Sequence, residues 1–188
     1  MWGCNMVPIP LTIPTPPMTT APILNRAAIA LGANLGDTVQ TLNSAIAVLA
    51  EQPTIALIAR SSWYQTAAVG PPQPDYINGC VVIETSLEPQ ELLTLLLTTE
   101  NQFGRERRER WGARTLDLDL LLYGDRTLST PQLELPHPRM SIRAFVLVPL
   151  AEIAPTWIDP ISGRSIEQLV QMVDCSEVQR FPRVTDAC

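Results

Sequence analysis

The chain has 188 residues and a formal net charge of −6, and its thirteen basic residues are all arginine. This length suits one domain with tails and is short for two full domains. Because lysine is absent, the chain cannot build a P-loop nucleotide site, a protein kinase site or a Schiff base. The acidic balance argues against wrapping nucleic acid or lying on an anionic membrane. No uninterrupted apolar run approaches the length of a helix that spans a bilayer.

The first 25 residues carry no charge and six prolines, which predicts a disordered or extended tail. These prolines would also interrupt the apolar helix of a secretory signal. The four cysteines form no CxxC pair, so we expect no zinc site and a free-thiol, cytoplasmic protein. We therefore expect a tail at 1–25, one domain at 26–160, and a C-terminal helix and tail at 161–188.

Hydrophobic periodicity and turn residues predict strands and helices in a definite order. In chain order they are a strand at 27–32, a helix at 38–51 capped by Asp37, a strand at 55–64, a strand at 76–85, a helix at 89–102 and a strand at 116–123. Further helices are expected at about 140–153 and 165–173, and the proline-rich segment 65–74 is expected to form a shaped loop. The order predicts an α+β fold, a ferredoxin-like βαββαβ core with extra C-terminal helices.

The stretch RERRERWGARTLDLD at 105–119 is the most informative part of the sequence. Side chains alternate along a strand, so Asp117 and Asp119 are predicted on one face, about 7 Å apart. Two carboxylates at that spacing can hold magnesium, with phosphate oxygens in its remaining positions. The alternative is a solvated strand face that carries two acids, and the pair alone does not decide between them.

Five of the thirteen arginines lie between Arg105 and Arg114, directly before the paired acids. Guanidinium groups match phosphate oxygens two at a time, so this stretch suits a magnesium-bound nucleotide. The alternative is a surface mesh of salt bridges with Glu106 and Glu109. We expect the mesh to explain some of the arginines, and phosphate binding to explain two or three.

Two further side chains in the sequence stay ambiguous on spacing alone. Trp111 could stack on a flat ring or anchor its loop. His137 is the single histidine and lies between two prolines, and a lone histidine is more often structural than catalytic. The sequence contains no Ser-His-Asp set, zinc motif or glycine-rich dinucleotide turn.

Four segments together resemble the 6-hydroxymethyl-7,8-dihydropterin pyrophosphokinase family of the folate pathway. They are LGANLGD at 31–37, the tyrosine and asparagine of PDYIN at 74–78, RWGARTLDLDLLLYG at 110–124, and PHPRMSIRAFVLVPL at 136–150. The resemblance runs from about residue 28 to 155. It implies a ferredoxin-like α+β core and transfer of the pyrophosphoryl group of ATP to the pterin hydroxymethyl oxygen. AMP would be released, and two Mg²⁺ ions would assist.

The resemblance also implies roles at the phosphate end of the site. Asp117 and Asp119 would hold both metal ions. Catalysis would depend on Arg105, Arg114 and Asp119, and the proton of the attacking hydroxyl would pass to Asp119 or to solvent. ATP would contact Glu100, Arg107, Arg110, Trp111, Arg114, Leu120, His137 and Arg143. The resemblance thus favours a functional His137 over a structural one.

For the pterin, the resemblance implies a slot in which Tyr76 and Phe145 sandwich the ring, each stack contributing about 0.5–1.5 kcal/mol. Asn78 and Thr66 would satisfy the amide-like edge of the ring, and the loop after Thr66 would close over both substrates. The implied pterin-binding residues are Thr66, Ala67, Val69, Tyr76, Asn78, Trp111 and Phe145. We expect a monomer that binds ATP and this pterin, without nucleic acid or membrane as a partner.

The chain departs from the family pattern at Ala33, where the family usually has serine, and at Ala67 and Ala68, where it usually has prolines. Two alternatives to an enzyme also remain. A ferredoxin-like fold with a basic loop could be an RNA-binding module, although that function needs aromatic residues on the central strands. A regulatory domain that binds a small molecule is the other alternative, but it would leave the paired aspartates without a use.

Overall fold

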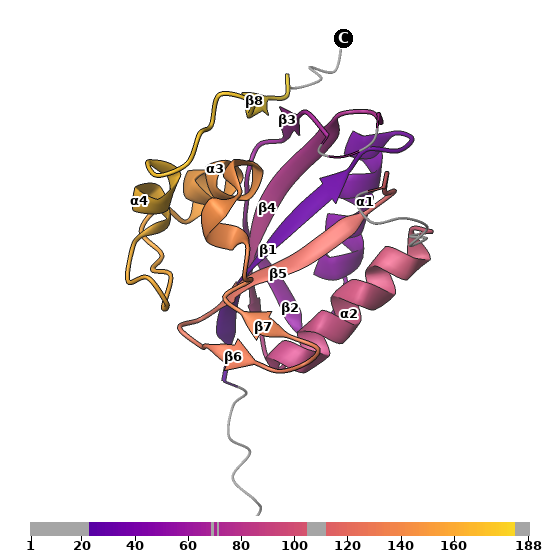
Figure 1. The fold of residues 1–188 in the computed structure, drawn as a ribbon. Helices are drawn as coiled ribbons and strands as arrows, with labels where there is room; N and C mark the ends of the chain where they lie inside the picture. The colour runs from indigo at the N-terminus through magenta and orange to yellow at the C-terminus, as the bar shows by residue number, and fades with distance from the viewer. Residues whose placement is uncertain (1–22, 69, 71, 105–111, 183–188) are drawn as a thin grey trace, which may run out of the picture.

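The computed structural model describes residues 23–68, 70, 72–104 and 112–182. The main strands and helices follow in the predicted order, with further short elements between and after them (Figure 1). In chain order they are β1 (Asn25–Ala33), α1 (Thr38–Ala50), β2 (Ile55–Arg60), β3 (Tyr64–Thr66), β4 (Tyr76–Thr85), α2 (Pro89–Gln102), β5 (Asp117–Tyr123), β6 (Leu128–Ser129), β7 (Glu134–Leu135), the 3-10 turn η1 (Met140–Ile142), α3 (Ala144–Ile153), α4 (Ile166–Val170) and β8 (Gln179–Arg180).

The main sheet has the strand order β5-β1-β4-β3-β8, and β2 also pairs with β4. All of these pairs are antiparallel. The strands β1 and β2 therefore run parallel with β4 between them, and α1 connects them. In the same way α2 connects β4 to β5 across β1. This is the split βαβ arrangement, so the predicted ferredoxin-like α+β fold is confirmed.

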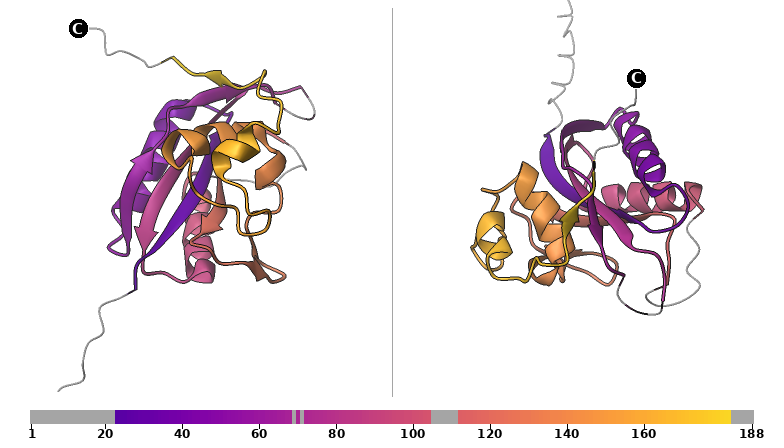
Figure 2. Two further views of the ribbon diagram at one scale, coloured as in Figure 1. Left: turned by 90° about the vertical axis from the view of Figure 1, so that its left-hand side faces the viewer. Right: turned by 90° about the horizontal axis from the view of Figure 1, so that it is seen from above.

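The helices cover both faces of the sheet (Figure 2), with α1 and α2 on one face and α3 and α4 on the other. Because side chains alternate along a strand, β1 sends Ile29 and Leu31 towards α1 and α2 but Ala28 towards α3. On β4, Cys80 and Val82 also pack under α3. Each face of the sheet thus has its own buried apolar cluster.

The helix ends follow from their capping residues. Asp37 caps α1 by accepting a hydrogen bond from the backbone N–H of Gln40 at 3.0 Å, as predicted. Glu88 and Glu91 form a capping box at the start of α2, where Pro89 occupies the first turn. The apolar residues of α1 and α2 pack against the sheet. This packing fixes the position of β5, and the site lies beside that strand.

Several predicted boundaries need correction. The strand expected at 55–64 is two strands, because between them the Ser61 hydroxyl accepts the Cys80 N–H that a regular strand would pair with a carbonyl. The strand β3 then extends to Thr66, into the segment expected to be a loop. The helix expected at 140–153 is a 3-10 turn followed by α3, because Arg143 has an extended backbone.

The C-terminal region packs against the rest of the fold. Ile166 and Leu169 of α4 are buried in the cluster under α3, and β8 pairs with β3. The helix expected at 165–173 is the shorter α4, and the hairpin of β6 and β7 and the strand β8 were not predicted. Within the described ranges, no helix has the length and apolar character needed to cross a membrane.

Candidate active site

A pocket of about 460 Å³ lies on the face of the sheet that α3 covers only in part. Its floor comes from β1, β4 and β5, and its walls come from β3 and from the segment that leads into α3. The lining residues are Ala30, Leu31, Gly32, Thr66, Ala67, Tyr76, Asn78, Arg114, Asp117, Asp119, Arg139, Ile142, Arg143, Phe145 and Val146. Most of the site residues predicted from sequence that the structure describes are among them.

Asp117 and Asp119 project from the same face of β5, as the alternation of the sequence predicted. Their side chains are 22% and 35% exposed, while Leu118 between them is buried on the opposite face. Across the strand pair, Asp117 lies opposite Gly32 and Asp119 opposite Ala30. The two carboxylates therefore sit on the pocket floor beside residues that have almost no side chain.

Two arginines and a histidine surround this pair of carboxylates. Arg114 Nη1 donates to Asp117 Oδ2 at 2.6 Å. Arg143 Nη1 lies 3.6 Å and His137 Nε2 lies 3.7 Å from Asp119 Oδ2. Burial lowers the pKa of Arg143, although Asp119 opposes this shift. The arrangement concentrates positive charge where phosphate oxygens could enter.

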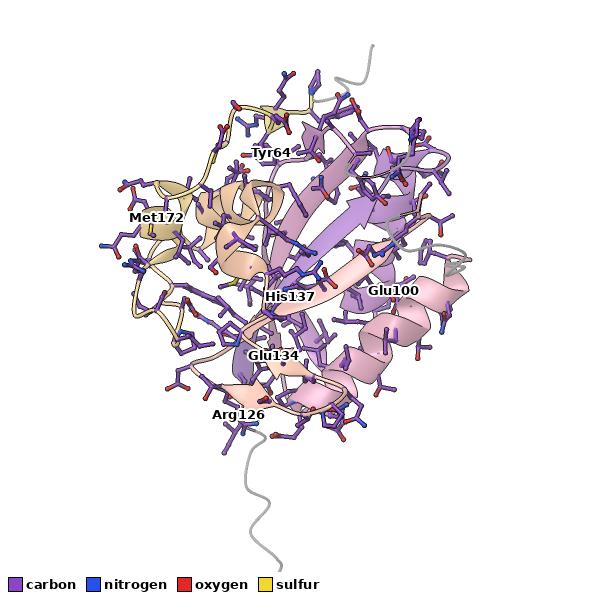
Figure 3. All side chains as sticks on the ribbon, viewed as in Figure 1. Tyr64, Glu100, Arg126, Glu134, His137 and Met172 are labelled. Atoms are coloured by element: carbon purple, nitrogen blue, oxygen red, sulfur yellow. The ribbon has the colours of Figure 1, made fainter. Side chains whose placement is uncertain are left out.

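His137 is held in one orientation beside β5 (Figure 3). Its backbone N–H donates to the carbonyl of Leu121 at 2.9 Å, and its Nδ1 accepts the backbone N–H of Arg139 at 3.1 Å. Burial lowers the pKa of His137, opposed by Asp119 and reinforced by Arg143. The neutral ring therefore carries its proton on Nε2, which faces Asp119 and can donate a hydrogen bond there.

The carboxylate pair also suits a magnesium ion. Among the described residues, no group of three or more His, Cys, Asp or Glu side chains could hold a metal by itself. Magnesium, however, is commonly held by one or two carboxylates, with water and substrate phosphates as its other ligands. The oxygen donors of Asp117 and Asp119 on one strand face fit that requirement.

Aromatic and uncharged polar residues line another part of the pocket. Tyr76 on β4 and Phe145 in the first turn of α3 both line it, and the Tyr76 hydroxyl donates to the carbonyl of Gly112 at 3.1 Å. Asn78 and Thr66 are buried, and Asn78 Nδ2 donates to Thr66 Oγ1 at 2.8 Å. Aromatic walls beside a fixed polar edge can accept a flat heterocycle that carries hydrogen-bonding groups.

Three predicted ATP-binding residues in the described ranges are not among those that line the pocket. One is His137, which lies 3.7 Å from Asp119 in the lining, and the other two, Glu100 and Leu120, lie farther from it. Glu100, labelled on α2 in Figure 3, is 1% exposed, and its carboxylate accepts the backbone N–H of Leu118 at 2.7 Å. Leu120 is buried in the cluster with α1 and α2. Glu100 thus ties α2 to the outer edge of β5, and the ATP roles of both residues stay predictions.

Other predicted residues lie outside the described part of the chain. They are Val69, Arg105, Arg107, Arg110 and Trp111.

Sequence reasoning missed Gly32, Asn34, Arg139 and Ile142. Asn34 directly follows β1 and is buried, and its side-chain amide donates to the Gln73 side chain and to the Pro74 carbonyl, both at 3.0 Å. Asn34 Oδ1 also accepts the backbone N–H of Arg114 at 2.7 Å. The asparagine within LGANLG was the available signal, because a buried side-chain amide must find partners.

The fold and the site together define a class. Paired carboxylates, arginines and a histidine next to an aromatic slot are suited to an enzyme that transfers a phosphate-containing group to a flat heterocycle. The 7,8-dihydro-6-hydroxymethylpterin-pyrophosphokinase family model matches residues 28–155. The chain belongs to this family, as its sequence predicted, and it is an enzyme.

Similar proteins agree with this assignment. A 2-amino-4-hydroxy-6-hydroxymethyldihydropteridine pyrophosphokinase of Synechocystis is 57% identical over 152 residues, covering 81% of this chain and 78% of the relative. The protein of the same name from Haemophilus influenzae is 42% identical over 157 residues, covering 83% of this chain and 98% of the relative.

Solved structures share the fold. A crystal structure of Plasmodium falciparum HPPK-DHPS with pteroate has a TM-score of 0.66 and 14% identity. The match covers 82% of this chain but 43% of that longer one, and at this identity the likeness shows the fold alone.

Proposed function

We propose that the pocket transfers the pyrophosphoryl group of ATP to the hydroxymethyl oxygen of 6-hydroxymethyl-7,8-dihydropterin, giving the pterin diphosphate and AMP. This reaction is the activity of the family, a step of folate biosynthesis. One observation carries the assignment to this pocket. The carboxylates and cations at one end and the aromatic slot with its polar edge at the other line a single cavity.

Asp117 and Asp119 are the proposed metal ligands, and we propose two Mg²⁺ ions between them and the phosphates. When bound, Mg²⁺ would neutralise charge on the phosphate oxygens and help to align ATP. Asp119 also faces His137 and Arg143, so these two hydrogen-bond donors would remain near the phosphates once the carboxylate binds metal. The chain thereby supplies both signs of charge that a magnesium nucleotide needs.

The arginines and His137 are proposed to bind and orient the phosphates. Arg114 can offer a two-pronged donor close to Asp117, and His137 can donate from Nε2. Arg143 begins α3 and lines the pocket, and Arg139 adds a further guanidinium to the same wall. Such fixed donors lower the barrier by matching charge that develops in the transition state, without a covalent intermediate.

Arg105, Arg107, Arg110 and Trp111 keep the phosphate and nucleotide roles expected from the sequence, as predictions. Val69 likewise keeps its expected pterin contact.

The pterin ring is proposed to lie between Tyr76 and Phe145. Asn78 and Thr66 already hold each other by a buried hydrogen bond, so their remaining polar atoms have fixed directions. A ring that failed to satisfy them would leave buried polar groups unpaired, which penalises the wrong heterocycle. Ala67 follows Thr66 along the same wall of the pocket.

We further propose that the enzyme acts as a monomer in the cytoplasm. Residues of one chain supply both the carboxylate end and the aromatic end of the proposed site, which supports a monomer. Cys80 and Cys175 are free thiols, which is typical of a reducing compartment.

The direct test incubates the protein with ATP, Mg²⁺ and the pterin and measures AMP. AMP above the level without pterin supports the enzyme and excludes both a regulatory and an RNA-binding module, whereas its absence refutes the proposal. Asp117→Asn and Asp119→Asn should each remove most of the magnesium-dependent turnover while the fold persists. An undiminished rate in either variant would refute the metal assignment.

A further inference from the structure

A cluster of polar side chains lies next to the pocket without lining it. It consists of Ser62, between β2 and β3, Tyr64 on β3, Glu152 at the end of α3, and Arg180 on β8. These four residues, the Glu152 cluster, join three elements that are far apart in sequence. Tyr64 is labelled in Figure 3.

The carboxylate of Glu152 is the centre of the cluster. It accepts hydrogen bonds from the backbone N–H of Ser62 at 2.8 Å, from the Ser62 hydroxyl at 2.9 Å and from the Tyr64 hydroxyl at 2.9 Å. Arg180 Nη2 donates to the Ser62 hydroxyl oxygen and lies 3.4 Å from Glu152 Oε1. Several donors converge on one carboxylate at the surface, whose side chain is 31% exposed, and this is a stronger arrangement than an isolated surface ion pair.

On one side the cluster holds β3. This strand has three residues, and Thr66 at its end lies two residues beyond Tyr64, or about 7 Å along the strand. Tyr64 pairs with Asn78 across the sheet, and Asn78 bonds the Thr66 hydroxyl. The position of the polar edge of the pocket therefore depends on where β3 lies.

On the other side the cluster holds α3. Phe145 is two helical turns before Glu152, about 10 Å along the axis. Pro149 lies between them and removes one helical hydrogen bond, but buried residues of α3 hold the helix against the sheet. Fixing Glu152 therefore also restrains the aromatic wall of the pocket. The distance between Phe145 and the edge formed by Thr66 and Asn78 is thus set at a point outside the pocket.

The contribution of Arg180 comes from the C-terminal segment. Tyr64 pairs with Arg180, Gln65 pairs with Gln179, and the backbone N–H of Phe181 donates to the Trp63 carbonyl at 2.8 Å. This segment follows the residues that match the family model, which end at 155. The edge of β3 is therefore covered by a strand from beyond the matched region.

We propose that Glu152 and Arg180 are positioning residues for the pterin: they lock β3 against α3 and thereby set where the Thr66–Asn78 edge lies relative to the aromatic wall at Phe145. The inference rests on the proposed pterin site. Neither residue touches a substrate, so loss of the cluster should weaken pterin binding while the phosphate end keeps its geometry.

The experiment compares Glu152→Gln, Arg180→Ala and Arg180→Lys with the wild-type enzyme, measuring kcat and both KM values by AMP release. Glu152→Gln keeps the shape but cannot accept every hydrogen bond, and Arg180→Ala changes an exposed side chain that should not prevent folding. We expect the pterin KM to rise about five- to tenfold in both, with kcat and the ATP KM within about twofold of wild type. Because one nitrogen of Arg180 makes both contacts, Arg180→Lys should restore most of the loss.

Two reference variants accompany them. Glu84→Gln breaks another ion pair, the 3.0 Å contact with Arg26 at the far end of β4, and should leave every kinetic constant unchanged. Phe145→Ala removes a proposed ring contact directly and should raise the pterin KM. Thermal unfolding of each variant shows whether the fold survives.

The outcomes separate the inference from the proposed site. If Phe145→Ala raises the pterin KM but Glu152→Gln and Arg180→Ala do not, the positioning role is refuted and the pocket assignment stands. If kcat and both KM values worsen together, or Arg180→Lys rescues nothing, the cluster is only structural. If Phe145→Ala also changes nothing, the pterin site is misplaced and the inference falls with it.

Discussion

Gly32→Ala is the substitution whose effect follows most directly from the geometry. Gly32 lies on the pocket floor, paired with Asn78 on one side and Asp117 on the other. A Cβ added at this position would lie 3.1 Å from Asn78 Oδ1 and 3.8 Å from Tyr76 Cδ1. The first distance is tighter than an ordinary contact, so Asn78 must shift by a few tenths of an ångström.

The magnitude follows from the hydrogen bonds at the polar edge of the pterin. A displaced Asn78 that leaves a buried polar group of the bound ring unpaired costs about 1–3 kcal/mol, which corresponds to a rise in the pterin KM of about 5- to 150-fold. The free energy of unfolding should change little. Alanine within a strand is favoured over glycine by about 0.5–1 kcal/mol, and this gain offsets the cost of displacing Asn78 in the folded state. The variant should therefore separate binding from stability.

The assay measures the pterin KM at saturating ATP and Mg²⁺, and the free energy of unfolding in urea. Gly79→Ala provides the contrast, because its Cβ would meet ring carbons of Trp63 at 2.5 and 2.6 Å and should destabilise the fold. A Gly32→Ala enzyme with a pterin KM within twofold of wild type would refute the placement of the pterin on this floor. A loss of several kcal/mol of stability in that variant would refute the packing argument.

Three other predictions follow from the side-chain contacts described above. Arg114→Lys keeps the charge beside Asp117 but loses the two-pronged guanidinium donor, so pyrophosphoryl transfer should slow about 10- to 100-fold. Pterin binding, measured by calorimetry, should stay nearly intact, and equal losses of transfer and of pterin binding would contradict a role for Arg114 at the phosphates alone. Glu100→Gln weakens the buried bond to the Leu118 N–H, so urea unfolding should show a loss of about 1–3 kcal/mol with little change in the ATP KM; a large KM change at unaltered stability would instead support an ATP role for Glu100. Burial raises the pKa of Glu152, but hydrogen bonds from its neighbours outweigh this and lower the pKa overall. The ionised Glu152 carboxylate therefore stabilises the fold fully at pH values above the usual carboxyl range, and this stabilisation is lost as the pH falls through the lowered pKa. The stability difference between wild type and Glu152→Gln should accordingly shrink from pH 7 to about pH 3.5, and a constant difference would contradict the shift.

The fold was predictable because its main elements carry strong periodic signals. The alternation of TLDLDLLL placed Asp117 and Asp119 on one face, and the structure confirms that placement. The split between β2 and β3 was not predictable, because it depends on a single hydroxyl, that of Ser61, which replaces a backbone partner. The strand β8 has two residues and forms only where β3 offers a free edge, so no local pattern indicates it.

The site shows the same division between local and tertiary information. Spacing alone could not decide whether His137 is structural, and the resemblance favoured a function; the structure brings its Nε2 towards Asp119. By contrast, the burial of Glu100 against β5 depends on how α2 crosses the sheet, which periodicity does not specify. Arg139 was missed because its position on the wall depends on the turn that precedes α3.

The buried thiol of Cys80 can be used to measure how often α3 opens away from the sheet. Burial raises the pKa of Cys80, and its Sγ lies 3.6 Å from the carbonyl oxygen of Val146, a residue that also lines the pocket. A thiol reagent can reach this sulfur only when α3 lifts from β4, so its labelling rate reports the frequency of that opening, whereas the less buried Cys175 provides an internal comparison. The rate of Cys80 labelling in the unmodified enzyme thus measures how much bound substrates slow the opening of α3, which forms part of the pocket wall.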